Sequence, residues 1–158
     1  MVTVAEATAD FLAQKRIAVA GVSRNAGAHS GNAVYDRLVS RGYETFAVNP
    51  NADEIDGKPC FRSLAAIPGG VDAVVIATAP DAAADVIADC ERLGIKRVWM
   101  HRSFGGGSVS EEAAAAGRKA GMTVIAGGCP LMFDPTADVG HKCMRWVIGF
   151  TSAKPKAG

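Results

Sequence analysis

The sequence predicts a single α/β domain in which helices cover both faces of a parallel β-sheet. Short uninterrupted apolar runs, typical of strands buried on both faces, alternate along the chain with segments of helical periodicity. Such alternation is typical of parallel strands joined by crossover helices. The length of 158 residues fits one domain with one core.

The first expected elements are a helix, a strand and a second helix. The spacing of Thr3 and Glu6 is that of a capping box, which predicts a helix near residues 4–14. Residues 16–22 form an apolar run that contains a glycine near its end, and we expect the first buried strand there. A polar loop follows, and then a helix over residues 32–41.

The same alternation continues to the end of the chain. Further strands are expected at residues 45–48, 73–78, 97–100 and 123–126, with helices at 82–93 and 110–120. Between the second and third strands, residues 50–68 are predicted to be an irregular connection, with a turn at 57–59 and a short helical turn at 63–67. A helix is expected at 139–148, the domain at 1–150 and a flexible, frayed tail at 151–158.

Five parallel strands with right-handed crossovers predict a three-layer, Rossmann-like, doubly wound sheet. The expected strand order is 3-2-1-4-5. Folds of this kind bind ligands beyond the carboxyl ends of the strands, near the point where the strand order reverses. The residues that directly follow each strand are therefore the candidates for function.

The composition excludes several classes of protein. The chain has 17 basic and 16 acidic residues and 49% hydrophobic residues, so neither disorder nor a nucleic-acid partner is expected. No apolar run approaches the roughly 20 residues that span a bilayer, and the first ten residues lack the basic start of a secretory signal. Four dispersed cysteines do not form a disulfide framework, so we expect a cytoplasmic protein.

A glycine-containing loop after the first strand is a candidate phosphate site. It begins at Gly21 and leads into a helix, an arrangement that directs backbone N–H groups at phosphate. The dinucleotide pattern Gly-x-Gly-x-x-Gly is not met, because Ser23 and Ala26 replace its second and third glycines. The Ser23 hydroxyl and the Arg24 guanidinium can contact phosphate instead. In the alternative interpretation, Gly21 only makes a turn, Arg24 is solvated and Ser30 caps the helix.

The ends of the next two strands carry further candidate residues. The second strand ends in Asn49 and Pro50, where an NAD-binding protein places an acidic residue for the ribose, and Asp53 comes several residues too late. After the third strand, residues 77–80 are mostly small and leave space for a flat ring. Either segment can also be an ordinary turn.

These segments belong to an ordered set that extends along most of the chain. The set is Gly21-Val22-Ser23-Arg24, Gly31-Asn32-Ala33-Val34, Gly42-Tyr43, Val48-Asn49-Pro50, Ile55-Asp56-Gly57, Ser63-Leu64, Val71-Asp72, Val98-Trp99-Met100 and Gly128-Cys129-Pro130. Taken together, residues 11–146 resemble the CoA-binding domain family. That family is similar to the amino-terminal domain of the succinyl-CoA synthetase alpha subunit.

The resemblance implies that the ligand is coenzyme A or an acyl-CoA. It implies that Gly21, Ser23 and Arg24 hold the phosphates and that Cys129 and Pro130 close the crevice. The full set of implied ligand-binding residues is Gly21, Val22, Ser23, Arg24, Ser30, Asn32, Asn49, Pro50, Ala77, Thr78, Ala79, Pro80, Cys129 and Pro130. Where the synthetase domain has a lysine two residues beyond the proline after its second strand, this chain has Ala52, so one phosphate contact is expected to be missing.

We expect a binding module rather than an enzyme, with no catalytic residue. The synthetase requires a second domain with a phosphorylated histidine and a partner subunit, and the residues after Gly128 are too few to supply them. Cys129, His141 and Cys143 provide at most three metal ligands, so no metal is expected. The expected partner is the small ligand, with a second copy or a partner protein as further alternatives. An NAD(P)-linked oxidoreductase or redox sensor using Cys129, and a scaffold without ligand, stay open.

Overall fold

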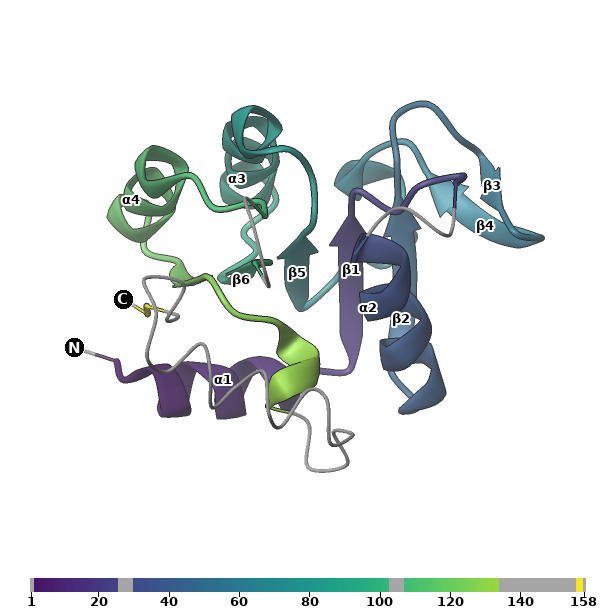
Figure 1. Ribbon diagram of the computed structural model, residues 1–158. Helices are drawn as coiled ribbons and strands as arrows, with labels where there is room; N and C mark the ends of the chain where they lie inside the picture. Colours follow the sequence, from purple (N-terminus) through teal and green to yellow (C-terminus); the bar gives the residue numbers. More distant parts are fainter. Residues whose placement is uncertain (1, 26–29, 103–106, 134–155, 158) are drawn as a thin grey trace.

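Helices cover both faces of a central seven-stranded sheet in the computed structural model (Figure 1). The structure describes residues 2–25, 30–102, 107–133 and 156–157. The predicted class, an α/β fold with a largely parallel, doubly wound sheet, is confirmed. The helix expected at 139–148 lies outside the described residues.

Every strand and helix expected within the described residues occurs, with boundaries that differ by a few residues. The strands are β1 (Arg16–Ala20), β2 (Glu44–Val48), β3 (Glu54–Ile55), β4 (Lys58–Phe61), β5 (Ala73–Ile76), β6 (Arg97–Met100) and β7 (Thr123–Ala126). The helices are α1 (Val4–Leu12), α2 (Ser30–Ser40), α3 (Ala83–Arg92) and α4 (Glu111–Lys119), and short 3-10 turns are η2 (Leu64–Ala66), η3 (Pro80–Ala82) and η4 (Pro130–Met132).

The strand count and the strand order differ from the prediction. The order is β3-β4-β2-β1-β5-β6-β7, so the third predicted strand, β5, pairs with β1 instead of lying beyond β2. The place beyond β2 belongs to β4, which also forms an antiparallel hairpin with β3. This segment was expected to be a turn because Gly57 and Pro59 interrupt it. Proline is tolerated near the sheet edge, where β4 pairs with β2 at only two positions.

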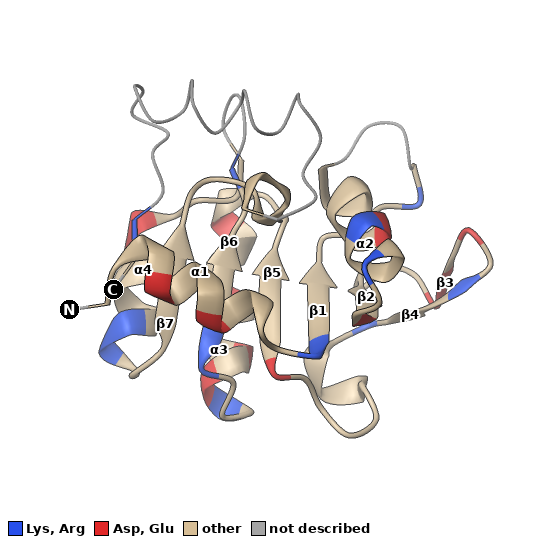
Figure 2. Cartoon of the chain, turned by 90° about the horizontal axis from the view of Figure 1, so that it is seen from below, with Lys and Arg blue, Asp and Glu red and all other residues tan. Residues whose placement is uncertain are grey.

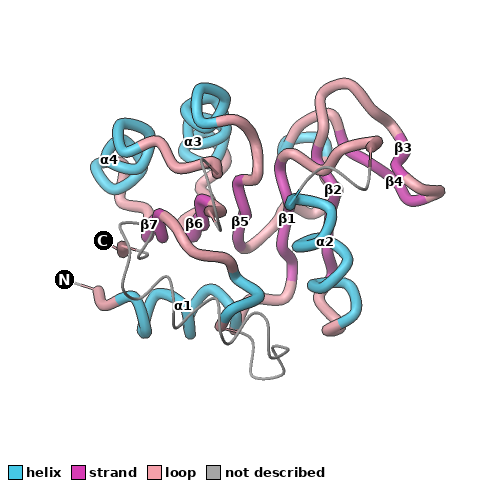
Figure 3. The backbone as a smooth tube through the Cα atoms, in the orientation of Figure 1, coloured by secondary structure: helices cyan, strands magenta, loops and turns pink. Residues whose placement is uncertain are grey.

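The two faces of the sheet belong to separate hydrophobic clusters. Alternate side chains of β1, β5, β6 and β7 point to opposite faces, and one set packs against α1, α2 and η4. The other set packs against α3, α4 and η2. Figure 3 shows α3 and α4 on one side of these strands and α1 on the other. Because both faces are covered, the strands are continuously apolar, which is why they were predictable.

The amino-terminal helix begins as the sequence predicts. The backbone N–H of Thr3 donates to the Glu6 carboxylate at 2.9 Å, and the backbone N–H of Glu6 donates to the Thr3 hydroxyl at 3.2 Å. The Thr3 hydroxyl also donates to the Glu6 carboxylate, at 2.7 Å. The two bonds that the carboxylate accepts, from the Thr3 N–H and the Thr3 hydroxyl, lower the pKa of the Glu6 carboxyl because they stabilise its charged form. The capping box is therefore confirmed.

The described part of the carboxyl-terminal tail is attached to the sheet. Lys156 exchanges two backbone hydrogen bonds with Ala126 of β7, at 2.8 and 2.9 Å, and its side chain pairs with Glu111 at 3.3 Å. The domain boundary at residue 150 and the flexible tail at 151–158 stay predictions. Within the described residues, the helices lack the length and apolar composition needed to span a membrane.

Candidate ligand-binding site

A groove of about 530 Å³ lies at the carboxyl ends of β1, β2 and β5. The strand order reverses between β1 and β5, which is where doubly wound sheets bind ligands. Figure 2 shows the arrowheads of β1, β5, β6 and β7 directed toward this same edge. The lining residues are Ala20, Gly21, Val22, Ser23, Val48, Asn49, Pro50, Arg62, Ser63, Leu64, Ala77, Thr78, Ala79, Ala82, Asp85, Val86 and Asp89.

Gly21 makes the turn from β1 into the groove, and no other residue type fits there. Its φ is +97°, in the region that favours glycine, and a Cβ would lie 2.6 Å from the carbonyl carbon and oxygen of Ala77. Gly31, in the first turn of α2, is also in close contact with this turn, because an added Cβ would lie 2.7 Å from the carbonyl oxygen of Gly21. The two glycines let the start of α2 approach the ends of β1 and β5.

The loop after Gly21 is held by a buried amide. Asn32 Oδ1 accepts the Ser23 N–H at 2.8 Å, and Asn32 Nδ2 donates to the Ser23 carbonyl at 2.7 Å. Asn32 was expected to contact the ligand, but it is buried and both of its polar atoms hold the loop. The Ser23 hydroxyl accepts the Asn25 N–H at 3.1 Å, and its proton has no acceptor among the described residues. Ser23 can therefore donate that proton to a ligand.

Asn49 links the end of β2 to its neighbours. Its Nδ2 donates to the Val22 carbonyl at 2.9 Å, and its Oδ1 accepts the Asn51 N–H at 2.8 Å. Its backbone N–H donates to the carbonyl of Phe61, the last residue of β4, at 2.9 Å. Asn49 itself stands at the position where NAD-binding folds place an acid for the ribose hydroxyls.

The groove carries charged residues that the sequence analysis missed. Arg62 lines it from the end of β4, and Asp85 and Asp89 line it from α3. Asp53 pairs with Arg62, and this contact lowers the pKa of the Asp53 carboxyl and raises the pKa of Arg62. Arg62 was missed because β4 was not expected to be a strand. The sequence therefore provided no reason to expect Arg62, which directly follows β4, at the carboxyl edge of the sheet.

The structure gathers part of the predicted set around the groove. Eight predicted residues line it, namely Gly21, Val22, Ser23, Asn49, Pro50, Ala77, Thr78 and Ala79. Arg24 and Ser30 are exposed and lie outside the lining, and Pro80 starts η3 beyond it. Ser30 is the first residue of α2.

Cys129 and Pro130, which were expected to close the crevice, are not among the lining residues of this groove. Cys129 is buried in the cluster beside α1 and α2, and burial raises the pKa of its thiol to about 11, the opposite of a reactive cysteine. Pro130 lines a second groove of about 820 Å³ among α1, α2 and η4, away from the strand ends. His141 and Cys143 lie outside the described residues, which hold no group of three or more metal-ligating side chains.

His101 follows β6 at the same edge of the sheet and makes the fold sensitive to acid. It is 3% exposed, and burial lowers its pKa to about 4 from the ordinary 6.5. Between these values the unfolded chain binds a proton that the folded chain does not, so stability falls as the pH falls below 6.5.

We expect His101 to cost about 2 to 3 kcal/mol of folding free energy between pH 7.5 and pH 4.5. Urea unfolding at both pH values measures this loss. In His101→Gln the loss of folding free energy over the same pH range should be smaller by about 2 to 3 kcal/mol, because the carboxylates titrate equally in both proteins. An identical pH dependence in the two proteins would contradict the prediction.

Comparison with known proteins identifies relatives of this domain. A family described as CoA binding domain matches residues 15–135. Acetate–CoA ligase [ADP-forming] II from Archaeoglobus fulgidus is 37% identical over 89 residues, which are 55% of this chain and 13% of the ligase. The chain therefore spans a small part of that enzyme.

Solved structures with a similar fold are also known. A conserved hypothetical protein from Pyrococcus furiosus is 36% identical, with a TM-score of 0.60 over 70% of this chain and 90% of its own. The apo form of dinucleotide forming acetyl-coenzyme A synthetase 1 from Ca. Korarchaeum cryptofilum is 27% identical, with a TM-score of 0.58. That similarity covers 70% of this chain and 25% of the synthetase.

Proposed function

Because the chain belongs to the CoA-binding domain family, we propose that it binds coenzyme A or an acyl-CoA, without catalysis, in the groove at the ends of β1, β2 and β5. The observation that carries this proposal is the turn at Gly21, where the absence of a Cβ lets a loop and the start of α2 meet at the strand ends. A diphosphate placed there faces the Ser23 hydroxyl and the amino-terminal end of the helix dipole.

The remaining walls suit the other parts of such a ligand. The groove volume falls within the range of small-molecule sites, and Leu64, Ala82 and Val86 supply apolar surface. Small residues at Ala77 and Ala79 leave room beside the backbone for a flat ring or a narrow arm.

Two observations weigh against the alternative of an NAD(P)-linked oxidoreductase or redox sensor. The polar atoms of the Asn49 side chain are hydrogen-bonded to Val22 and Asn51. Asn49 occupies the position where NAD-binding folds have an acid that binds the ribose. The Cys129 thiol, buried and with a raised pKa, is protonated at neutral pH. A sensor thiol requires the opposite environment.

The acetate–CoA ligase and the acetyl-coenzyme A synthetase are several times longer than the matched region, whereas the Pyrococcus furiosus protein is matched over 90% of its own length. From the two enzymes we infer that the domain works with a partner protein. In this proposal the groove binds the CoA part of the ligand, and the partner catalyses any reaction of the acyl group. A second copy of the chain stays an alternative partner. The proposal keeps the cytoplasmic location that the sequence predicts.

Thermal unfolding with CoA, acetyl-CoA, NAD, NADP and ATP tests the proposal. A ligand that binds only the folded state stabilises it by about 2.7 kcal/mol at 100 times its Kd, so CoA or acetyl-CoA should raise the Tm measurably. Stabilisation by NAD alone would overturn the proposal.

Ser23→Glu should remove the stabilisation by CoA, because a carboxylate would face the diphosphate at the turn. We expect at least about tenfold weaker binding in titration calorimetry. Ser40→Glu, the same change at the exposed far end of α2, is the matched control and should bind as the unmodified protein does. Unchanged affinity in Ser23→Glu would show that the phosphates lie elsewhere.

A further inference from the structure

Arg62 offers a positive charge to the groove from the end of β4, on the side of β2 that lies away from Gly21. It is the one cationic residue among the described lining residues, and Asp85 and Asp89 on α3 carry the other lining charges. An anionic group therefore meets the cationic lining residue on the β4 side of the groove and two carboxylates on the α3 side.

Asp53 orients the Arg62 guanidinium. Arg62 Nε donates to Asp53 Oδ1 at 2.6 Å, and Nη2 donates to Oδ2 at 2.7 Å, so one edge of the guanidinium is used. The other edge, which carries Nη1, has no acceptor among the residues that the structure describes, and guanidinium edges match phosphate oxygens in pairs. The side chains of Arg62 and Asp53 are 63% and 73% exposed, so their pairing contributes little to stability.

The position of Arg62 separates it from the phosphate loop. It follows β4, and the order β4-β2-β1 puts two strand spacings, roughly 10 Å, between its backbone and Gly21. A diphosphate at the Gly21 turn therefore leaves Arg62 available for a second phosphate group. Ala52, where the resemblance led us to look for a lysine, is 4% exposed and cannot supply that contact.

The end of β2 is where doubly wound folds hold the adenosine ribose. An acid there binds the ribose hydroxyls, whereas an arginine nearby accommodates a ribose phosphate. Here the acid is absent, and the backbone of Asn49 is hydrogen-bonded to Phe61, the residue before Arg62.

We propose that Arg62, oriented by Asp53, binds a phosphomonoester on the ligand's ribose and selects phosphorylated ribose over unphosphorylated ribose. This inference rests on the proposed function, in which the group is the 3′-phosphate of CoA. The 2′-phosphate of NADP has the same chemistry and is distinguished by the test.

Titration calorimetry of the full chain with CoA, 3′-dephospho-CoA, NADP and NAD provides that test. The unmodified protein should bind CoA about tenfold or more tightly than dephospho-CoA, since one charge-assisted contact is lost with the phosphate. Arg62→Gln should lose about tenfold in CoA affinity and nothing for dephospho-CoA. Arg62→Lys should fall between, because an ammonium lacks the planar pair of donors.

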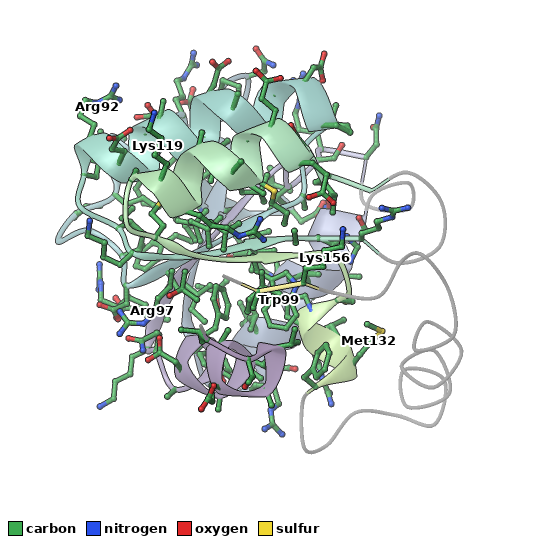
Figure 4. The ribbon with its side chains drawn as sticks, turned by 90° about the vertical axis from the view of Figure 1, so that its left-hand side faces the viewer. Arg92, Arg97, Trp99, Lys119, Met132 and Lys156 are labelled. Carbon is green, nitrogen blue, oxygen red and sulfur yellow. The ribbon has the colours of Figure 1, made fainter. Side chains whose placement is uncertain are left out.

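Arg97→Gln is the matched control. Arg97 also pairs with an aspartate, Asp10 of α1, at 2.7 Å, but it begins β6 at the opposite edge of the sheet (Figure 4). This variant should bind each ligand as the unmodified protein does.

The outcomes separate the two proposals. If CoA binds, and Arg62→Gln lowers the affinities for CoA and dephospho-CoA equally or changes neither of them, the assignment of Arg62 is wrong and the proposed function stands. If neither CoA nor dephospho-CoA binds, but NADP binds more tightly than NAD only when Arg62 is present, the ribose-phosphate assignment stands and the proposed function fails. If no ligand binds the unmodified protein, both are overturned.

Discussion

Gly21→Ala is expected to destabilise the fold by about 4 kcal/mol and to remove CoA binding. The added methyl group would lie 2.6 Å from the carbon and oxygen of the Ala77 carbonyl, and the φ of +97° is strained for any residue with a side chain. Backbone atoms of two neighbouring strands cannot separate without breaking the pairing of β1 and β5, so the overlap is not relieved locally.

Gly42→Ala isolates the conformational part of this effect. Gly42 has a similar φ of +85°, but nothing lies within 4 Å of the position that an added methyl group would take. Its substitution should cost about 1 kcal/mol and leave CoA affinity unchanged. Urea unfolding and calorimetry of both variants measure the two quantities, and equal losses of stability would show that close contact with Ala77 is not what requires glycine at position 21.

Trp99→Ala is expected to destabilise the fold by about 4 kcal/mol, with no loss of affinity in the protein that remains folded. Trp99 is fully buried on the α1 side of the sheet, where its ring packs edge to face on Phe11 with centroids 5.4 Å apart (Figure 4). Its Nε1–H donates to the Gly127 carbonyl at 3.0 Å. Removing the ring leaves a cavity between the sheet and α1, and neither β6 nor α1 contributes a lining residue to the candidate groove.

Trp99→Phe divides the effect into packing and hydrogen bonding. Phenylalanine keeps an aromatic contact with Phe11 but leaves the Gly127 carbonyl without its donor, so we expect a loss of about 2 kcal/mol. Urea unfolding measures both variants, and CoA titration at low temperature shows whether the groove is intact. A large loss of affinity in Trp99→Ala would contradict the separation of core and site.

The sequence alone determined the class of fold and the position of the glycine turn after the first strand. Strands covered on both faces must be apolar along their whole length, so β1, β5, β6 and β7 are visible as runs without any knowledge of their neighbours. The capping box at Thr3 is equally local. Gly21 was found because it ends such a run before a helix, which is a property of adjacent residues.

Only the tertiary structure decided how these elements assemble at the site. β4 is a strand despite Pro59 because it pairs with β2. It takes the place beyond β2, so β5 lies next to β1 instead, and Arg62, which follows β4, lies at the groove. Asn32 supports the loop because its amide is hydrogen-bonded to Ser23, nine residues away, and Cys129 is a core residue because it is buried in the cluster to which α1 and α2 contribute. A local sequence pattern predicts only the structure that depends on neighbouring residues in the chain. Strand pairing and burial bring together residues that are far apart in the chain, and their stabilising energies exist only in the folded protein.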